Sequence, residues 1–145
     1  MTQRVLILCT GNSARSQMAE GLLRTLSEGT IEVHSAGTKP SQVNPHAIRV
    51  MAERGIDISH QRSKHLNEFL TQPFDVVVTV CDQAAEACPV FPGRAERLHW
   101  SFPDPAAVVG SEEERLAAFR EVRDALEARL RTWLDEKKHL EGSHA

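Results

Sequence analysis

The first 26 residues constrain this chain more than any later segment, because an apolar run passes through a cysteine-containing loop into a helix-forming stretch. Residues 5–8 are Val-Leu-Ile-Leu, a run typical of a strand buried on both faces of a parallel sheet. Residues 15–26 are rich in helix-forming side chains. Residues 9–16, which we call the Cys9 loop, therefore lie where a strand ends and a helix begins. This order predicts an α/β fold.

The rest of the sequence repeats the alternation of strands and helices. Further strands are predicted over residues 30–36, 74–80 and 97–100, and further helices over 45–52, 63–70 and 112–137. Asn44 is the expected N-cap of the second helix, with Pro45 at its first position. The order predicts a four-stranded parallel sheet flanked by helices on both faces. We expect one domain over residues 1–140 and a flexible tail over 141–145.

The Cys9 loop has the composition of an anion-binding site. Free backbone N–H groups and the positive end of a helix dipole converge where a helix begins, and they favour a tetrahedral oxyanion. Cys9 is expected to ionise easily in that field and act as a nucleophile, while Arg15 holds two oxygens of the anion. Gly11 allows close backbone approach, Asn12 tolerates a left-handed conformation, and Ser16 can donate to the thiolate. The predicted substrate-binding residues are Thr10, Gly11, Asn12, Ser13, Ala14, Arg15 and Ser16.

The competing interpretation of the same residues is a buried cysteine at a strand end, followed by an ordinary helix cap. The combination of loop, helix and arginine favours the anion site over this interpretation.

Composition excludes several other classes of protein. The formal net charge is −3, so no broad basic field attracts nucleic acid or an anionic membrane, and anion binding must be local. Neither a signal peptide nor an apolar run of membrane-spanning length is visible, so we expect a soluble, cytoplasmic protein. The seven histidines are scattered, and none is placed with the cysteines at a zinc-binding spacing, so no metal site is expected.

Cys81 and Cys88 form a second candidate site. With Cys9 they make three cysteines, and an odd number argues against a static disulfide framework. The segment between them is helix-friendly, and two residues seven apart on a helix have Cα atoms roughly 10 Å apart. A disulfide tolerates no more than about 7 Å, so this pair can bond only if the segment unwinds. The pair is therefore either two independent buried thiols or a redox switch that changes shape.

The loop Cys9-Thr10-Gly11-Asn12-Ser13-Ala14-Arg15-Ser16 resembles the Cys-x5-Arg-Ser signature of the low-molecular-weight protein tyrosine phosphatases. Asp104, in Phe-Pro-Asp-Pro-Ala, is similar to that family's general acid, although Asp-Pro alone is also typical of a turn. Those phosphatases usually carry tyrosines after this Asp-Pro. This chain has no tyrosine, and Ala106 and Ala107 stand there instead, which weakens a phosphotyrosine-stacking interpretation.

Cys9, Cys81 and Cys88 together resemble the cysteine triad of the thioredoxin-coupled arsenate reductases, which share the phosphatase scaffold. The resemblance spans nearly the whole chain and includes Ser-Ala-Gly at 35–37, Val-Cys-Asp at 80–82, Cys-Pro at 88–89 and Trp-Ser-Phe-Pro-Asp-Pro at 100–105. The loop is shared with the phosphatases, whereas the added cysteine pair is specific to the reductases.

The resemblance implies a three-cysteine relay. Cys9 attacks arsenate held by the loop and Arg15, and Asp104 helps an oxygen leave as water. Cys81 attacks the Cys9 sulfur, which releases arsenite, and Cys88 then takes over the disulfide from Cys9. Thioredoxin reduces the Cys81–Cys88 bond. The same resemblance implies weak phosphatase side activity, no tightly bound cofactor and a monomer.

Some members of that family bind potassium beside the loop, through residues matching Asn12, Glu20, Ser35 and an aspartate. The first three are present here, but the nearest candidate for the fourth place is Lys64. One hypothesis is that the Lys64 ammonium replaces the potassium charge beside Glu20. The alternative is a solvated surface lysine.

Two other functions are compatible with parts of this sequence. A phosphatase would use Cys9, Arg15 and Asp104 alone, whereas a thiolate sensor would capture arsenite or a soft metal with the three cysteines. The sensor gives Arg15 and Asp104 no purpose, and no DNA-reading stripe accompanies the thiols. Cys81 and Cys88 discriminate between the reductase and the phosphatase.

Overall fold

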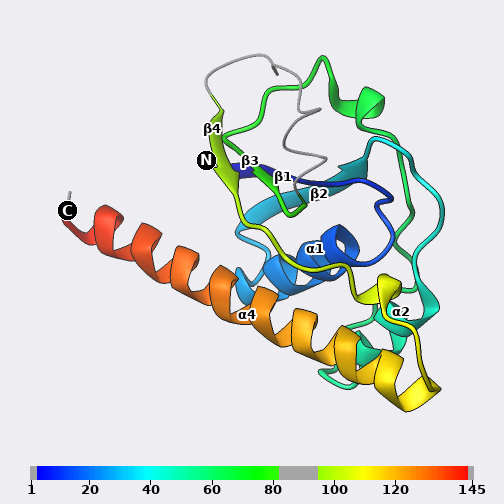
Figure 1. Cartoon of the computed structure of the whole chain (residues 1–145). Coiled ribbons are helices and arrows are strands. Elements are labelled where there is room, and N and C mark those ends of the chain that lie inside the picture. Colours follow the sequence, from blue (N-terminus) through cyan, green and yellow to red (C-terminus); the bar gives the residue numbers. More distant parts are fainter. Residues whose placement is uncertain (1–2, 82–94, 144–145) are drawn as a thin grey trace.

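The fold is built on a four-stranded parallel sheet with strand order β2-β1-β3-β4 (Figure 1). The computed structural model describes residues 3–81 and 95–143. Its strands are β1 (Gln3–Cys9), β2 (Ile31–Gly37), β3 (Val76–Thr79) and β4 (Glu96–His99). The prediction of a four-stranded parallel sheet is confirmed, although β3 is shorter than the β-branched run at 74–80 indicated.

The strand register places the ends of three strands at one edge of the sheet. β1 lies between β2 and β3, with Cys9 opposite Gly37 and Leu8 opposite Thr79. Because all pairs are parallel, the carboxyl ends of the strands meet at this edge, where ligands bind in open α/β sheets. Cys9 and Cys81 therefore share one rim.

Three α-helices pack together on one face of the sheet. They are α1 (Arg15–Leu26), α2 (Pro45–Ala52) and α4 (Glu112–Ser143), and α4 contacts both of the others. Figure 1 shows α1 and α4 side by side beneath the strands. The apolar residues of α4 recur at steps of three and four and are buried at Leu116, Phe119, Val122, Leu126, Leu130 and Trp133. This helix ends at Ser143 rather than 137, since no strong stop signal precedes Gly142.

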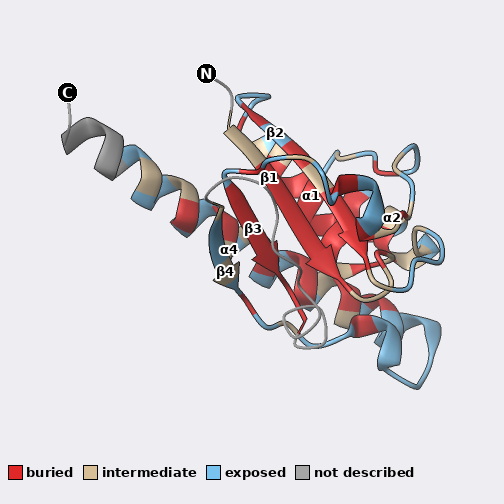
Figure 2. Cartoon of the chain, turned by 90° about the horizontal axis from the view of Figure 1, so that it is seen from above, coloured by how far each residue is buried: buried red, intermediate tan, exposed pale blue. Residues whose placement is uncertain are grey.

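The opposite face is covered at its β2 edge by a short helix. This is the 3-10 helix η1 (Leu66–Phe69), where the sequence predicted a helix over 63–70. Ser35 contacts Glu20 of α1, so its neighbour His34 points to the other face, where its ring packs on Phe69. Figure 2 shows buried residues along β1 and β3 and an exposed edge at β4. The helix-friendly segment between Cys81 and Cys88 lies outside the described residues.

In the described ranges, no helix is long and apolar enough to cross a membrane.

Candidate active site

The Cys9 loop connects β1 to α1 and encloses a small cavity. This cavity has a volume of about 90 Å³. Arg15 begins α1, so the loop residues lie at the positive end of a twelve-residue helix. The cavity is lined by Cys9, Gly11, Ser13, Ala14, Arg15, Asp104 and Ala106. The structure thus brings Asp104, far away in sequence, to the loop as predicted.

The backbone of the loop is turned so that its N–H groups face inward. The carbonyls of four consecutive residues each accept a hydrogen bond from a group outside the cavity. In a trans peptide the carbonyl and the next N–H point in opposite directions, so the amides of residues 11–14 point the other way, toward the cavity. The bonds are Lys39 N to Thr10 O (2.9 Å), Ser41 N and Ser63 Oγ to Gly11 O (3.2 and 3.0 Å), Gln17 Nε2 to Asn12 O (3.0 Å), and Asn44 N to Ser13 O (2.9 Å).

Gly37 at the end of β2 is also required by this loop. A Cβ at Gly37 would press on the Thr10 carbonyl oxygen and lie 2.9 Å from the Asn12 nitrogen. Asn12 itself has φ +46°, the left-handed conformation predicted for it. In the sequence, Gly37 stands out only as the last residue of Ser-Ala-Gly at 35–37, directly after the strand predicted over 30–36. Its pairing with Cys9 in the sheet, which the strand order implies, is the signal that links it to the loop.

Arg15 is held at the cavity by the chain segment that carries Asp104. Its Nη1 donates to the Phe102 carbonyl oxygen at 3.0 Å, and its Nη2 lies 3.9 Å from Asp104 Oδ2. Asp104 Oδ1 accepts from the Ala106 backbone N at 3.0 Å, as the N-cap of the 3-10 helix η2 (Pro105–Ala107). The Asp104 carboxylate is half-exposed. It is therefore placed to exchange a proton with solvent and with an anion held by Arg15. Phe102 is a positioning residue that the sequence analysis missed.

Cys81 follows β3 and is buried beside the loop. Its Sγ lies 3.3 Å from Thr10 Oγ1, and it also forms a hydrogen bond with the Cys9 thiol. That bond, followed by burial, raises the pKa of Cys9, and the Arg15 charge opposes the shift. One thiol thus stabilises the protonated form of the other, which opposes the easy ionisation expected for Cys9. Cys88 lies outside the described residues.

Three predicted loop residues direct their side chains away from the cavity. Thr10 contacts Cys81, and Asn12 and Ser16 are fully buried behind the loop. Asn12 Nδ2 donates to Ser16 Oγ at 2.8 Å and to Ser35 Oγ at 3.0 Å. In this arrangement the Ser16 hydroxyl accepts from Asn12, whereas the sequence suggested a bond to the thiolate.

The network behind the loop continues to a buried ion pair. Ser35 Oγ donates to Glu20 Oε1 at 2.6 Å, and Lys64 Nζ lies 3.7 Å from the same oxygen. Glu20 and Lys64 are 5% and 9% exposed, so the interpretation of Lys64 as a solvated surface lysine is wrong. Burial lowers the pKa of Lys64, while Glu20 favours its charged form.

The oxygens of this network do not fit a potassium ion. Glu20 Oε2 accepts from Arg24 Nη2 at 2.8 Å, so two cations already contact the one carboxylate. Asn12 Oδ1 accepts from the Lys64 backbone N at 2.9 Å and from Gln17 Nε2 at 3.0 Å. The oxygens that would ligate a cation are thus occupied by protein donors. Across the part of the chain that the structure describes, no cluster of three or more His, Cys, Asp or Glu side chains could hold a metal.

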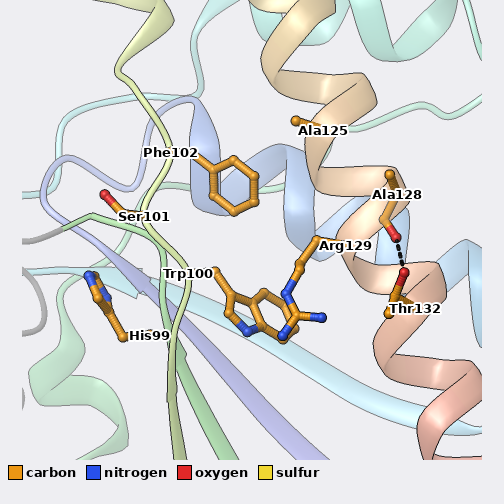
Figure 3. A pocket seen from close by; sticks show the side chains of 8 residues that line it. All are labelled: His99, Trp100, Ser101, Phe102, Ala125, Ala128, Arg129 and Thr132. Carbon is orange, nitrogen blue, oxygen red and sulfur yellow. Dashed lines mark hydrogen bonds between the residues drawn. The ribbon is translucent and has the colours of Figure 1, made fainter.

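A larger cavity of about 690 Å³ lies between α4 and the chain that leaves β4 (Figure 3). The Arg129 guanidinium lies 4.7 Å from the centre of the Trp100 ring, with Ala125 and Ala128 on the helix side. The described lining of this cavity contains no thiol and no residue of the Cys9 loop. The smaller cavity is therefore the candidate active site, because the nucleophile, guanidinium and carboxylate surround it.

Comparison with known protein families agrees with this geometry. Residues 4–143 match the family described as low molecular weight phosphotyrosine protein phosphatase. An arsenate reductase from Halalkalibacterium halodurans is 46% identical over 139 residues, which cover 95% of this chain and 100% of that protein. An arsenate reductase from Bacillus subtilis strain 168 is 43% identical over 134 residues, covering 92% and 96%.

Solved structures give the same similarity. An arsenate reductase in the oxidized state has a TM-score of 0.80 at 34% identity, covering 93% of this chain and 98% of that chain. One in the phosphate binding state has a TM-score of 0.75 at 34% identity with the same coverage. A thioredoxin-dependent arsenate reductase from Corynebacterium glutamicum has a TM-score of 0.74 at 26% identity, covering 93% and 61%.

Proposed function

The chain belongs to the low molecular weight phosphotyrosine protein phosphatase family, and we propose that it reduces arsenate to arsenite by a thiol relay. The observation that carries the proposal is the contact between the buried Cys9 and Cys81 thiols at the edge of an oxyanion-binding loop. A hydrolytic phosphatase needs one thiol there, whereas reduction needs two electrons and hence a second thiol within reach.

The first step is attack by Cys9 on the anion. Arsenate binds to the inward amides of the loop and to Arg15, whose charge stabilises the additional negative charge in the transition state. The Cys9 sulfur forms a bond to arsenic, and one arsenate oxygen leaves as water after accepting protons, one of them from Asp104. The arsenic stays at oxidation state V in this step, bonded to Cys9.

The second step reduces the arsenic. The Cys81 thiolate attacks the Cys9 sulfur, a Cys9–Cys81 disulfide forms, and the electron pair of the sulfur–arsenic bond passes to arsenic. Arsenite is released at oxidation state III, so the two thiols together supply two electrons. Cys88 then attacks Cys81, which frees Cys9 as a thiol and leaves a Cys81–Cys88 disulfide.

Thioredoxin is the proposed reductant of that final disulfide. The similarity to a thioredoxin-dependent arsenate reductase supports this assignment, as does the full set of three cysteines. We further propose that the protein has no tightly bound cofactor and is a monomer. We place it in the cytoplasm, where reduced thioredoxin keeps thiols available.

Phosphatase activity is the second candidate, because Cys9, Arg15 and Asp104 around one cavity are the groups that phosphoester hydrolysis requires. Ala106 lines the cavity, so this wall supplies no aromatic ring to stack on a phosphotyrosine. We therefore assign hydrolysis of small phosphoesters as a weak side activity.

The deciding experiment is arsenate turnover with thioredoxin, thioredoxin reductase and NADPH, followed by disulfide mapping. Cys81→Ser and Cys88→Ser should each abolish multiple turnover and leave hydrolysis of p-nitrophenyl phosphate at or above the wild-type rate. Cys9→Ser should abolish both activities. Full arsenate reduction by the Cys81→Ser/Cys88→Ser double variant would refute the relay.

A further inference from the structure

Lys64 contacts the Cys9 loop at Asn12 and two residues that lie behind the loop. Its backbone N donates to Asn12 Oδ1 at 2.9 Å, its carbonyl accepts from Gly37 N at 2.9 Å, and its ammonium lies 3.7 Å from Glu20 Oε1. The ammonium also donates to the Arg62 carbonyl oxygen at 3.0 Å. The side chain thus lies in a fixed position behind the loop.

The charge that Lys64 balances is close to the anion site. Through Ser35, Glu20 is two hydrogen bonds from Asn12, a residue of the anion-binding loop. A buried carboxylate without a counter-ion would repel a bound oxyanion and would carry a large desolvation cost. Arg24 pairs with the other carboxylate oxygen but is about half-exposed, whereas the Lys64 side chain is 9% exposed and is screened less by water.

We propose that the Lys64 ammonium is a built-in counter-ion that fixes Glu20, Ser35 and Asn12, so that the loop binds its oxyanion without a monovalent metal ion. The inference rests on the oxyanion-binding part of the proposed function and needs neither the thiols nor thioredoxin. Lys64 acts through other residues, so it is a positioning residue rather than a catalytic one. The protein donors that fill the oxygens of Glu20 and Asn12 are the physical reason that a metal ion has no place here.

Phosphate affinity of the full chain tests this directly. The dissociation constant of inorganic phosphate, measured by calorimetry, should be the same in potassium, sodium and choline chloride at equal ionic strength. Lys64→Met should weaken phosphate binding about tenfold, the order expected for losing one buried charge near an anion. Lys138→Met is the matched control, because it removes the same charge from an exposed position on α4 and should leave the affinity unchanged.

Two further variants distinguish an effect of Lys64 on the position of the loop from an effect on the stability of the fold. Glu20→Gln/Lys64→Met removes both charges and should recover most of the phosphate affinity lost in Lys64→Met, even if the single variant folds poorly. Lys64→Arg should recover part of it. Wild-type-like affinity in folded Lys64→Met, no recovery in the double variant, or severalfold tighter wild-type binding in potassium than in choline would each overturn the inference. Absence of phosphate binding by the wild-type protein would instead overturn the proposed anion site itself.

Discussion

At the scale of single residues, the shape of the Cys9 loop depends on side chains that its motif does not contain. The inward amides exist because Lys39, Ser41 and Asn44 donate backbone N–H groups to the loop carbonyls from outside. These donors lie between β2 and α2, where the sequence predicts no regular element. Motif residues could be read from the sequence because their chemistry is local. Their backbone partners could not be predicted, because every residue type except proline can donate a main-chain hydrogen bond.

Gly37 gives the sharpest test of that backbone arrangement. Gly37→Ala should lower the free energy of unfolding by about 1–3 kcal/mol and weaken phosphate binding, because the added Cβ presses on Thr10 and Asn12. Chemical denaturation and calorimetry measure the two effects. Gly11→Ala is the comparison for stability, since its Cβ would make only ordinary contacts at 3.7 and 3.8 Å. Equal stability of both variants would contradict the close approach at Gly37.

The hydrogen bond between the two thiols makes a prediction about reactivity. Because Cys81 is the main cause of the raised Cys9 pKa, Cys81→Ala should lower that pKa and speed alkylation of Cys9 at pH 7 severalfold. The pH dependence of iodoacetamide labelling, resolved by peptide mass spectrometry, measures the shift. Cys88→Ala is the control for thiol number. A Cys9 profile that stays at the wild-type midpoint in Cys81→Ala would show that burial, rather than Cys81, raises the pKa.

At the scale of elements, local signals predicted the helices that begin and end with strong capping residues. The limits of α2 are as predicted, and Asn44 caps it through a bond from the His46 backbone N. The short helix η1 and the length of α4 were less well predicted, because weak stop signals leave the outcome to packing. Nothing in the local sequence indicated that Phe102 would hold Arg15, since 87 residues separate them.

An ion-pair cluster joins α2 to α4 and should make the domain sensitive to acid. Arg120 and then Arg123 lower the pKa of Glu53 to about 2 from 4.5. A carboxylate with a depressed native pKa contributes stability that is complete above pH 4.5 and is lost as the pH falls toward 2. Glu53→Gln should therefore lower Tm at pH 7, and the difference from wild type should shrink between pH 4.5 and 2.

Thermal unfolding monitored by circular dichroism at several pH values measures this. Because Glu53 is exposed enough for salt to screen it, the difference should also shrink in 1 M salt. Glu121→Gln removes an equal charge from an exposed position on α4 and serves as the control. A Tm difference that is constant from pH 7 to pH 2 would exclude Glu53 ionisation as its cause.

At the scale of the whole molecule, a parallel sheet assembles the site from distant segments. The parallel direction of the strands could be predicted from the alternation of elements, and with it the meeting of Cys9 and Cys81 at one edge, whereas the strand order comes from the structure. The raised pKa of Cys9 could not be predicted from the sequence, because it depends on the distance between two thiols that are far apart in the chain. Likewise, the burial of Lys64 required the fold, since a lysine in a polar loop is usually solvated.

The core and the anion site should contribute independently to the stability of the whole domain. Leu126 is fully buried on α4, and the described lining of the Cys9 cavity does not include it. Leu126→Ala should lower the free energy of unfolding by about 2–5 kcal/mol. Phosphate at about 100 times its dissociation constant should add back about 2.7 kcal/mol in wild type and variant alike, because binding stabilises only the folded chain.

Urea denaturation with and without phosphate measures both contributions in one series. Arg15→Met is the control with impaired phosphate binding, because it removes the guanidinium that faces the cavity. This variant should lose most of the phosphate-dependent gain in the free energy of unfolding. If Leu126→Ala removed the gain while the protein remained folded, the packing of α4 would control the shape of the loop. Equal phosphate-dependent gains in wild type and Leu126→Ala would mean that the packing of α4 does not control the shape of the loop. The loop would then be held by its own hydrogen bonds to the segment between β2 and α2.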